Sequence, residues 1–105
     1  MRIQKNPIDG GFRLEIKDKG YLDCKVYDKQ IIFDCYTYPE HRKKGIFKIL
    51  LNKLMADYSN MDILAAVTNM KIIPYLKSVG FKETKEYLPY WGRPENSVNL
   101  KKKKL

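Results

Sequence analysis

An apolar stretch at residues 31–38 runs into a short basic loop, and the loop opens directly into a helical pattern that starts at Gly45. The stretch is apolar at nearly every residue, which is typical of a strand at the centre of a sheet. After Gly45 the apolar residues recur at helical spacing. The first N–H groups of such a helix have no partner within it. Because the helix dipole adds partial positive charge, the sequence predicts a site for phosphate or pyrophosphate.

Four basic side chains surround this predicted anion site: Arg42, Lys43, Lys44 and Lys48. The alternative interpretation is a solvated basic helix start without a ligand. The chain has 21 Lys and Arg residues against 12 Asp and Glu residues, and the net charge of +9 favours an anionic partner. Charge alone leaves nucleic acid, an acidic membrane and a phosphorylated cofactor open.

The cysteines and the single histidine argue against a metal site. Cys24 and Cys35 lie in strand-like segments without CxxC spacing, and His41 is the one histidine, so no zinc-ligand set can be assembled. The N-terminus lacks the apolar core of a signal peptide, and no apolar run approaches the length that spans a membrane. We expect a cytoplasmic protein with reduced thiols, no bound metal and no membrane partner.

The remaining segments predict one mixed α/β (α+β) domain. At 105 residues the chain is long enough for a single core, so residues 1–105 are expected to form one domain. Alternating segments around Asp18-Lys19-Gly20 predict an antiparallel hairpin, and Pro74 either starts or kinks the second helix. The expected order is β-β-β-α-β-α-β-β. Its segments are residues 12–17, 21–27, 31–38, 45–58, 62–67, 72–79, 81–87 and 97–103, with a basic tail at residues 101–105.

The basic loop resembles the signature of the GCN5-related N-acetyltransferase (GNAT) superfamily, which is Gln/Arg-x-x-Gly-x-Gly/Ala between a strand and a helix. Residues 42–47, with the sequence Arg-Lys-Lys-Gly-Ile-Phe, occupy this place, and Pro39 lies three residues before the arginine. Residues 69–81 are similar to the family's second motif, an asparagine followed by a helix that closes in Gly-Phe. The resemblance covers about residues 12–87. It implies the GNAT fold, in which two adjacent parallel strands splay apart to admit acyl-coenzyme A (acyl-CoA).

The resemblance also implies the residues that hold the cofactor. Backbone N–H groups of the basic turn would bind the pyrophosphate, and the strand edge at Tyr36 and Thr37 would pair with the pantetheine arm. Asn69 would hydrogen-bond the pantetheine region or cap the second helix. Phe47 departs from the family pattern, so its ring is expected to turn into the core. The implied set for acetyl-CoA or another acyl-CoA is Tyr36, Thr37, Arg42, Lys43, Lys44, Gly45, Ile46, Phe47, Lys48 and Asn69.

The usual catalytic acid and base are missing. Leu76 stands where many family members have the tyrosine that protonates the departing thiolate. Tyr75 is one residue earlier and would substitute only in a rotated or kinked helix. The family's base positions fall on Ile31 and Phe33, which are apolar, and Asp34 faces the other side of the strand. The sequence therefore names Tyr75 as the one candidate catalytic residue and no general base.

Two functions fit these patterns. The first is an acyl-CoA-dependent N-acyltransferase that moves an acetyl group to a primary amine by direct attack in a ternary complex. Its amine acceptor is expected to be acidic or bound to nucleic acid, because the positive charge exceeds what the cofactor needs, and a homodimer is left open. The second is a non-catalytic module of the same fold that binds CoA or nucleic acid, with stacking aromatics beside charge. The residues for that contact are Lys85, Tyr87, Tyr90, Trp91 and Arg93.

Overall fold

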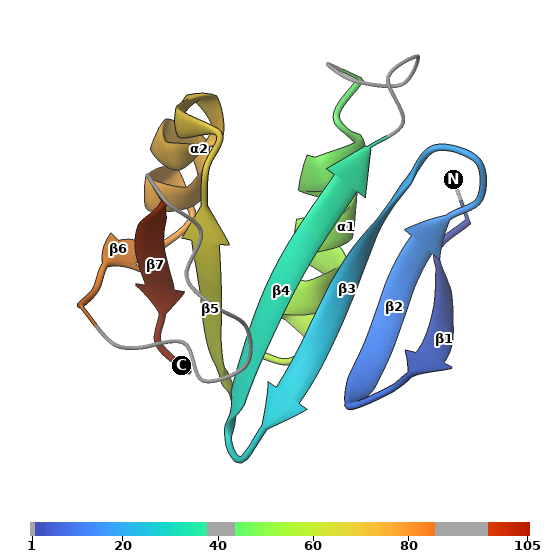
Figure 1. Ribbon diagram of the computed structural model, residues 1–105, viewed down its shortest axis with the longest axis horizontal. Coiled ribbons are helices and arrows are strands. Elements are labelled where there is room, and N and C mark those ends of the chain that lie inside the picture. Colours follow the sequence, from blue (N-terminus) through green and yellow to red (C-terminus); the bar gives the residue numbers. More distant parts are fainter. Residues whose placement is uncertain (1, 38–43, 86–96) are drawn as a thin grey trace.

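The computed structural model describes residues 2–37, 44–85 and 97–105. Within these residues, seven strands form one sheet in the order β1-β2-β3-β4-β5-β7-β6, as Figure 1 shows. The strands are β1 (Gln4–Ile8), β2 (Gly11–Ile16), β3 (Gly20–Tyr27), β4 (Gln30–Thr37), β5 (Asp62–Val67), β6 (Lys82–Glu83) and β7 (Val98–Lys102). The helices are α1 (Ile46–Asp57), the short 3₁₀ helix η2 (Met70–Ile72) and α2 (Ile73–Ser78).

The first four strands form an antiparallel meander in chain order. The predicted hairpin is confirmed, and its turn contains Asp18 at φ 64°, a conformation that aspartate tolerates better than most residues. Strand β1 is an addition, because the predicted order began at β2. Its middle is polar and contains Pro7, which weakens the strand pattern. A proline is accepted here because β1 is the edge of the sheet.

Strand β4 is central, as predicted, and runs parallel to β5. The parallel pairing covers three residue pairs, from Gln30 with Asp62 to Ile32 with Leu64. Beyond Ile32, β4 remains paired with β3 as far as Thr37, while β5 continues in its pairing with β7 as far as Val67. The two parallel strands therefore separate along their second halves, which confirms the predicted splay (Figure 1).

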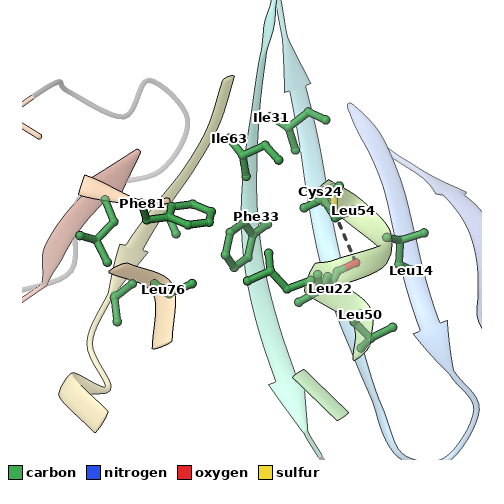
Figure 2. Packing of buried hydrophobic residues seen from close by; sticks show 14 of the residues in the cluster. Leu14, Leu22, Cys24, Ile31, Phe33, Leu50, Leu54, Ile63, Leu76 and Phe81 are labelled. Carbon is green, nitrogen blue, oxygen red and sulfur yellow. Dashed lines mark hydrogen bonds between the residues drawn. The ribbon is translucent and has the colours of Figure 1, made fainter. Parts of the chain in front are cut away.

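The core lies between the sheet and both helices, on the face that we call the helix face. Figure 2 shows Leu50 and Leu54 of α1 packed against Leu14 and Leu22 of the meander, and each of these four side chains is at most 1% exposed. On the side of β5, the fully buried Leu76 and Phe81 complete the same core. The opposite face, which we call the second face, has a small separate cluster of Ile32 and Leu64 with Ala66.

The predicted strand at residues 97–103 is confirmed as β7, and the basic segment from residue 101 begins within this strand rather than as a solvated tail. Lys101 and Lys102 belong to β7, and the Lys101 ammonium lies 3.4 Å from a carboxylate oxygen of Asp62. The backbone N–H of Lys104 also donates to Asp62, over 2.8 Å. Asp62 therefore holds this end of the chain on β5, and these contacts lower the pKa of its carboxyl group. The predicted strand at residues 81–87 is the short β6, and its last two residues lie outside the described residues.

No helix in the described part of the chain is long and apolar enough to cross a membrane.

Candidate functional site

A cleft of about 660 Å³ opens where β4 and β5 separate. This volume lies within the range of small-molecule sites in proteins, roughly 300–1,000 Å³. The cleft has one wall on β4, one on β5 and the residues after it, and an end at the start of α1. Its described lining consists of Phe33, Asp34, Cys35, Thr37, Gly45, Ile46, Phe47, Lys48, Ala65, Ala66, Val67, Thr68, Asn69, Lys71 and Ile72.

The cleft passes through the sheet, because its lining comes from both faces of each strand. Side chains along a strand alternate between faces. Phe33 belongs to the core on the helix face, whereas Ile32 belongs to the cluster on the second face. Asp34 therefore lies on the second face and Cys35 on the helix face. On β5 the same alternation separates Ala65 from Ala66.

The start of α1 supplies unpaired backbone donors to one end of the cleft. The first hydrogen bond of the helix runs from the Ile49 N–H to the Gly45 carbonyl, at 3.0 Å. The N–H groups of Ile46, Phe47 and Lys48 precede it, no side chain caps them, and the first turn has no acidic residue. Gly45 adopts φ +78°, although nothing lies within 4 Å of an added Cβ atom. Glycine is needed here for the backbone conformation and not for space.

Phe47 turns its ring into the protein, as predicted. It packs against the core on the helix face, with its ring centroid 6.2 Å from that of Phe33. The Phe33 ring in turn meets Phe81 edge-on at 6.2 Å, and Figure 2 shows these last two rings between β4 and β5. These aromatic rings form an apolar floor where the two strands begin to separate.

Asn69 has the capping role that the sequence allowed. Its side-chain oxygen accepts a hydrogen bond of 3.0 Å from the Lys71 N–H at the start of η2. Both residues line the cleft. Lys71 was not among the predicted site residues. It lines the cleft from η2, after β5, whereas the predicted Lys48 lines it from α1. Its signal in the sequence is a lysine two residues after the capping asparagine.

The structure does not bring Tyr75 into the described lining of the cleft. Its hydroxyl donates to the Asn52 side chain of α1 over 3.4 Å, and its ring lies 4.9 Å from the Lys48 ammonium. Partial burial raises the pKa of the hydroxyl. Leu76 is fully buried in the core, so neither residue presents a proton donor to the cleft. A catalytic role of Tyr75 stays a prediction.

Asp34 is the cleft residue whose importance the sequence analysis missed. It faces the second side of the strand, as expected, but the cleft is open through the sheet and Asp34 therefore lines it. The side chain is exposed, and its Oδ1 accepts a 3.0 Å hydrogen bond from the Cys35 N–H. The two base positions of the family pattern, Ile31 and Phe33, are buried in the core. A residue on the second face of β4 can line the cleft only where β5 has separated from β4.

The two cysteines differ in access to solvent. Cys35 is exposed in the cleft, whereas Cys24 is completely buried. Burial raises the pKa of the Cys24 thiol to about 12. Neighbouring atoms restrict the hydration of Cys35 and Asp34 adds negative charge, so the pKa of that thiol also rises, to about 11. Both cysteines are therefore neutral thiols near pH 7, and neither is an activated nucleophile.

The structure describes some of the remaining predicted site residues and not others. Lys44 is exposed beside the start of α1, and Tyr36 belongs to strand β4. Arg42 and Lys43 lie outside the described residues, as do Tyr87, Tyr90, Trp91 and Arg93 of the alternative nucleic-acid contact. Among the described residues, no group of His, Cys, Asp and Glu side chains could hold a metal ion.

Comparison with known proteins gives a match in structure alone. No family model matches the chain, and no curated protein matches it in sequence. Solved structures of acetyltransferases do match. The ribosomal-protein-S18-alanine N-acetyltransferase from Escherichia coli superposes with a TM-score of 0.69 at 16% identity, over 97% of this chain and 69% of that one. Arabidopsis thaliana Naa50 in complex with the bisubstrate analogue CoA-Ac-MVNAL gives 0.67 at 21% identity, over 87% of this chain and 70% of that one.

The chain has the GNAT fold. PaiA N-acetyltransferase from Thermoplasma acidophilum, in complex with coenzyme A, also matches with a TM-score of 0.61 and 18% identity. That match covers 88% of this chain and 58% of the PaiA chain. The chain thus spans between 58% and 70% of the length of these three neighbours. At these identities the comparison establishes the fold, and the activity rests on the geometry of the cleft.

Proposed function

We propose that the protein is an acyl-CoA-dependent N-acyltransferase that transfers an acetyl group from acetyl-CoA to a primary amine in a ternary complex. One observation carries the proposal: the cleft between separated parallel strands ends at the uncapped start of α1. A long ligand with a phosphate end and an amide-bearing arm suits both features. Solved neighbours of the same fold include one in complex with coenzyme A and one in complex with the bisubstrate analogue CoA-Ac-MVNAL.

The phosphate end is proposed to bind at the start of α1. The N–H groups around Gly45, from Lys44 to Lys48, provide donors for pyrophosphate oxygens, and the helix dipole favours negative charge there. Lys48 and Lys71 line the cleft and bring positive charge from two different elements. Arg42 and Lys43 are proposed to extend this basic surface.

The pantetheine arm is proposed to lie along the open edge of β4. The pairing of β4 with β5 ends at Ile32, so the edge of β4 that faces the cleft beyond this residue is not covered by β5. The backbone of such an edge hydrogen-bonds readily to the amides of an extended ligand, and Tyr36 and Thr37 are proposed to hold the pantetheine arm there. Asn69 is proposed to hydrogen-bond the pantetheine arm from the opposite wall, while its side-chain oxygen caps η2. The thioester would lie over the apolar surface of Phe33, Ala65 and Val67.

The chemistry that this site supports is direct aminolysis of a thioester. A primary ammonium first loses a proton to water. The amine lone pair then forms the C–N bond, the C–S bond breaks, and the thiolate takes a proton, so that one proton is released in total. Positioning of the two reactants can supply much of the acceleration, and a thiol of ordinary pKa, about 8.5, leaves readily without a strong acid. Cys35 is a neutral thiol, which favours direct transfer over an acyl-enzyme.

The proposal is tested in two steps. Acetyl-CoA and CoA should raise the unfolding temperature in a saturable way, because a ligand that binds only the folded state stabilises it. Incubation of the protein with acetyl-CoA and a panel of primary amines should then release free thiol faster than a protein-free control. No stabilisation by CoA would contradict the cofactor site. Stabilisation without turnover on any amine would support the non-catalytic alternative instead.

A further inference from the structure

Asp34 is the one acidic side chain in the described lining of the cleft. The other charged residues of that lining are Lys48 and Lys71, and both belong to the end where phosphate is proposed to bind. Asp34 lies on the second face of the sheet, opposite α1 and α2. The cleft therefore has positive charge at one end and a carboxylate where it emerges on the other side of the sheet.

The charged side chains on β3 nearest Asp34 have other hydrogen-bond partners. Its cross-strand partner on β3 is Asp23, which receives two hydrogen bonds from Arg13, of 2.6 Å and 3.0 Å. The Arg13 guanidinium also stacks over the Tyr21 ring at 3.8 Å. Lys25, a diagonal neighbour on β3, donates its ammonium to the Asp9 carbonyl. Within the described residues no cation lies within ion-pair distance of Asp34, whose carboxylate accepts a hydrogen bond from the Cys35 N–H.

The fold itself gives Asp34 no ion pair among the described residues. Asp23 and Asp34 are directly opposite each other in an antiparallel pair, a position where an opposite charge would stabilise a sheet, and the Arg13 guanidinium pairs with Asp23 instead. The remainder of the protein is strongly basic, with a net charge of +9, so a cation is repelled by most of the surface and attracted at this place.

We propose that Asp34 binds the ammonium group of a cationic amine acceptor, which enters the cleft from the second face. The inference rests on the proposed acyl transfer and names its substrate class: primary amines with positive charge beyond the reacting nitrogen. Donor and acceptor would then enter from opposite faces of the sheet. This class differs from the acidic or nucleic-acid-bound acceptor that the overall charge suggested.

A matched series of four-carbon amines tests the inference by binding, without the need for turnover. The ligands are 1,4-diaminobutane, n-butylamine and 4-aminobutanoate, which carry net charges of about +2, +1 and 0 near pH 7. Calorimetric titration into CoA-saturated protein should give the tightest binding for the diamine and the weakest for the amino acid. A difference of about 3- to 5-fold between the first and the last is expected for one exposed carboxylate.

Variants assign the effect to Asp34. Asp34→Asn should reduce the spread of the series to less than about twofold, and Asp34→Glu should restore part of it. Asp28→Asn is the matched control, because Asp28 lies in the turn that leads into β4 and has a positive φ that asparagine tolerates. It should leave the series unchanged. Asp34→Asn should also unfold at about the same temperature, since Asp34 makes no ion pair among the described residues.

Several outcomes would overturn the inference. These are an absence of diamine binding, tighter binding of 4-aminobutanoate, or an unchanged series in Asp34→Asn. A lower unfolding temperature together with weaker CoA binding in Asp34→Asn would show that the residue acts through the fold, and would overturn it too. The CoA affinity of the wild-type protein is measured separately. If CoA does not bind, the proposed function fails, and the amine series without CoA still decides the role of Asp34.

Discussion

Strand β4 has two halves that differ in what lies beside them. Gln30 to Ile32 are paired with β3 on one side and β5 on the other, whereas Phe33 to Thr37 are paired with β3 alone. The first half is buried on both faces, with Ile31 and Ile32 at 0% exposure. The second half carries Asp34 and Cys35, which are exposed in the cleft. The paired half holds the fold together, and the open half provides backbone and side chains for a ligand.

The largest effect is expected in the paired half. Ile31→Ala removes a fully buried side chain from the core, and such truncations cost about 2–5 kcal/mol. Thr37→Ala in the open half should cost less than about 1 kcal/mol, because Thr37 is only partly buried. Chemical denaturation measures both. Equal losses in the two variants would remove the distinction between the halves.

The next effect concerns the turn after the open half. Gly45→Ala places a Cβ atom at φ +78°, which costs about 1–2 kcal/mol of stability. The strained turn should shift, and one charge-assisted hydrogen bond between its backbone N–H groups and the pyrophosphate of CoA should be lost. Such a bond contributes about 1.5–3 kcal/mol, so the Kd for CoA should rise at least about tenfold.

Gly10 provides a matched control for Gly45, because it has the same φ of +78° and lies in the turn between β1 and β2, away from the cleft. Gly10→Ala should cost similar stability and leave the Kd for CoA unchanged. Weaker CoA binding in both variants would mean that the loss follows from stability and not from the anion site.

A smaller effect is expected from the cleft lysines. Lys48→Gln and Lys71→Gln should each weaken CoA binding by about 2- to 5-fold at low salt, because exposed charge pairs contribute up to about 1 kcal/mol. The loss should shrink as salt rises. Acetyl-pantetheine, which lacks the phosphates, should bind all variants equally. Lys53→Gln on α1 is the control, since Lys53 pairs with Asp57 and does not line the cleft.

The smallest effect is expected at Tyr75. Its hydroxyl contacts Asn52 and not the described cleft, so Tyr75→Phe should change kcat by less than about threefold, as for the loss of one exposed hydrogen bond. A fall of about 100-fold in kcat, with loss of the basic limb of its pH profile, would instead establish Tyr75 as the general acid.

The parts of the site that rest on backbone geometry were predictable from the sequence. Gly45 precedes α1 with a positive φ, which favours glycine, and Asn69 caps η2 with its side chain, which favours a small polar residue. Asp34 was placed on the correct side of its strand but could not be assigned to the cleft. Its exposure there depends on how far β4 and β5 separate, which is a property of tertiary packing.

The edges of the sheet were harder to predict for a similar reason. Strand β1 has an irregular pattern that becomes a strand only through its pairing with β2, because strand formation depends strongly on neighbours. Lys101 resembled the start of a charged tail, yet the Asp62 carboxylate is close enough in space to pair with it. Neither contact leaves a local signal in the sequence.

The most direct test of the account uses Cys35, the thiol of the open half, as a reporter of the cleft. Alkylation of Cys35 by iodoacetamide should still rise about tenfold per pH unit between pH 9 and 10, where a free thiol with a pKa near 8.5 levels off, because the pKa of Cys35 is raised to about 11. Cys24 is buried and should not react in the folded protein.

The decisive measurement is the alkylation rate of Cys35 at a fixed pH of 8 while acetyl-CoA is titrated, followed by mass spectrometry of the labelled peptides. Acetyl-CoA is used because its sulfur is a thioester and does not consume iodoacetamide, as the free thiol of CoA would. If the cofactor lies between β4 and β5, the labelling should slow in a saturable way and reach about tenfold at 10 times the Kd, where about nine-tenths of the sites are filled. The midpoint should match the Kd from calorimetry. Acetyl-CoA that binds without protecting Cys35 would place the cofactor elsewhere and contradict the assignment of the cleft between β4 and β5.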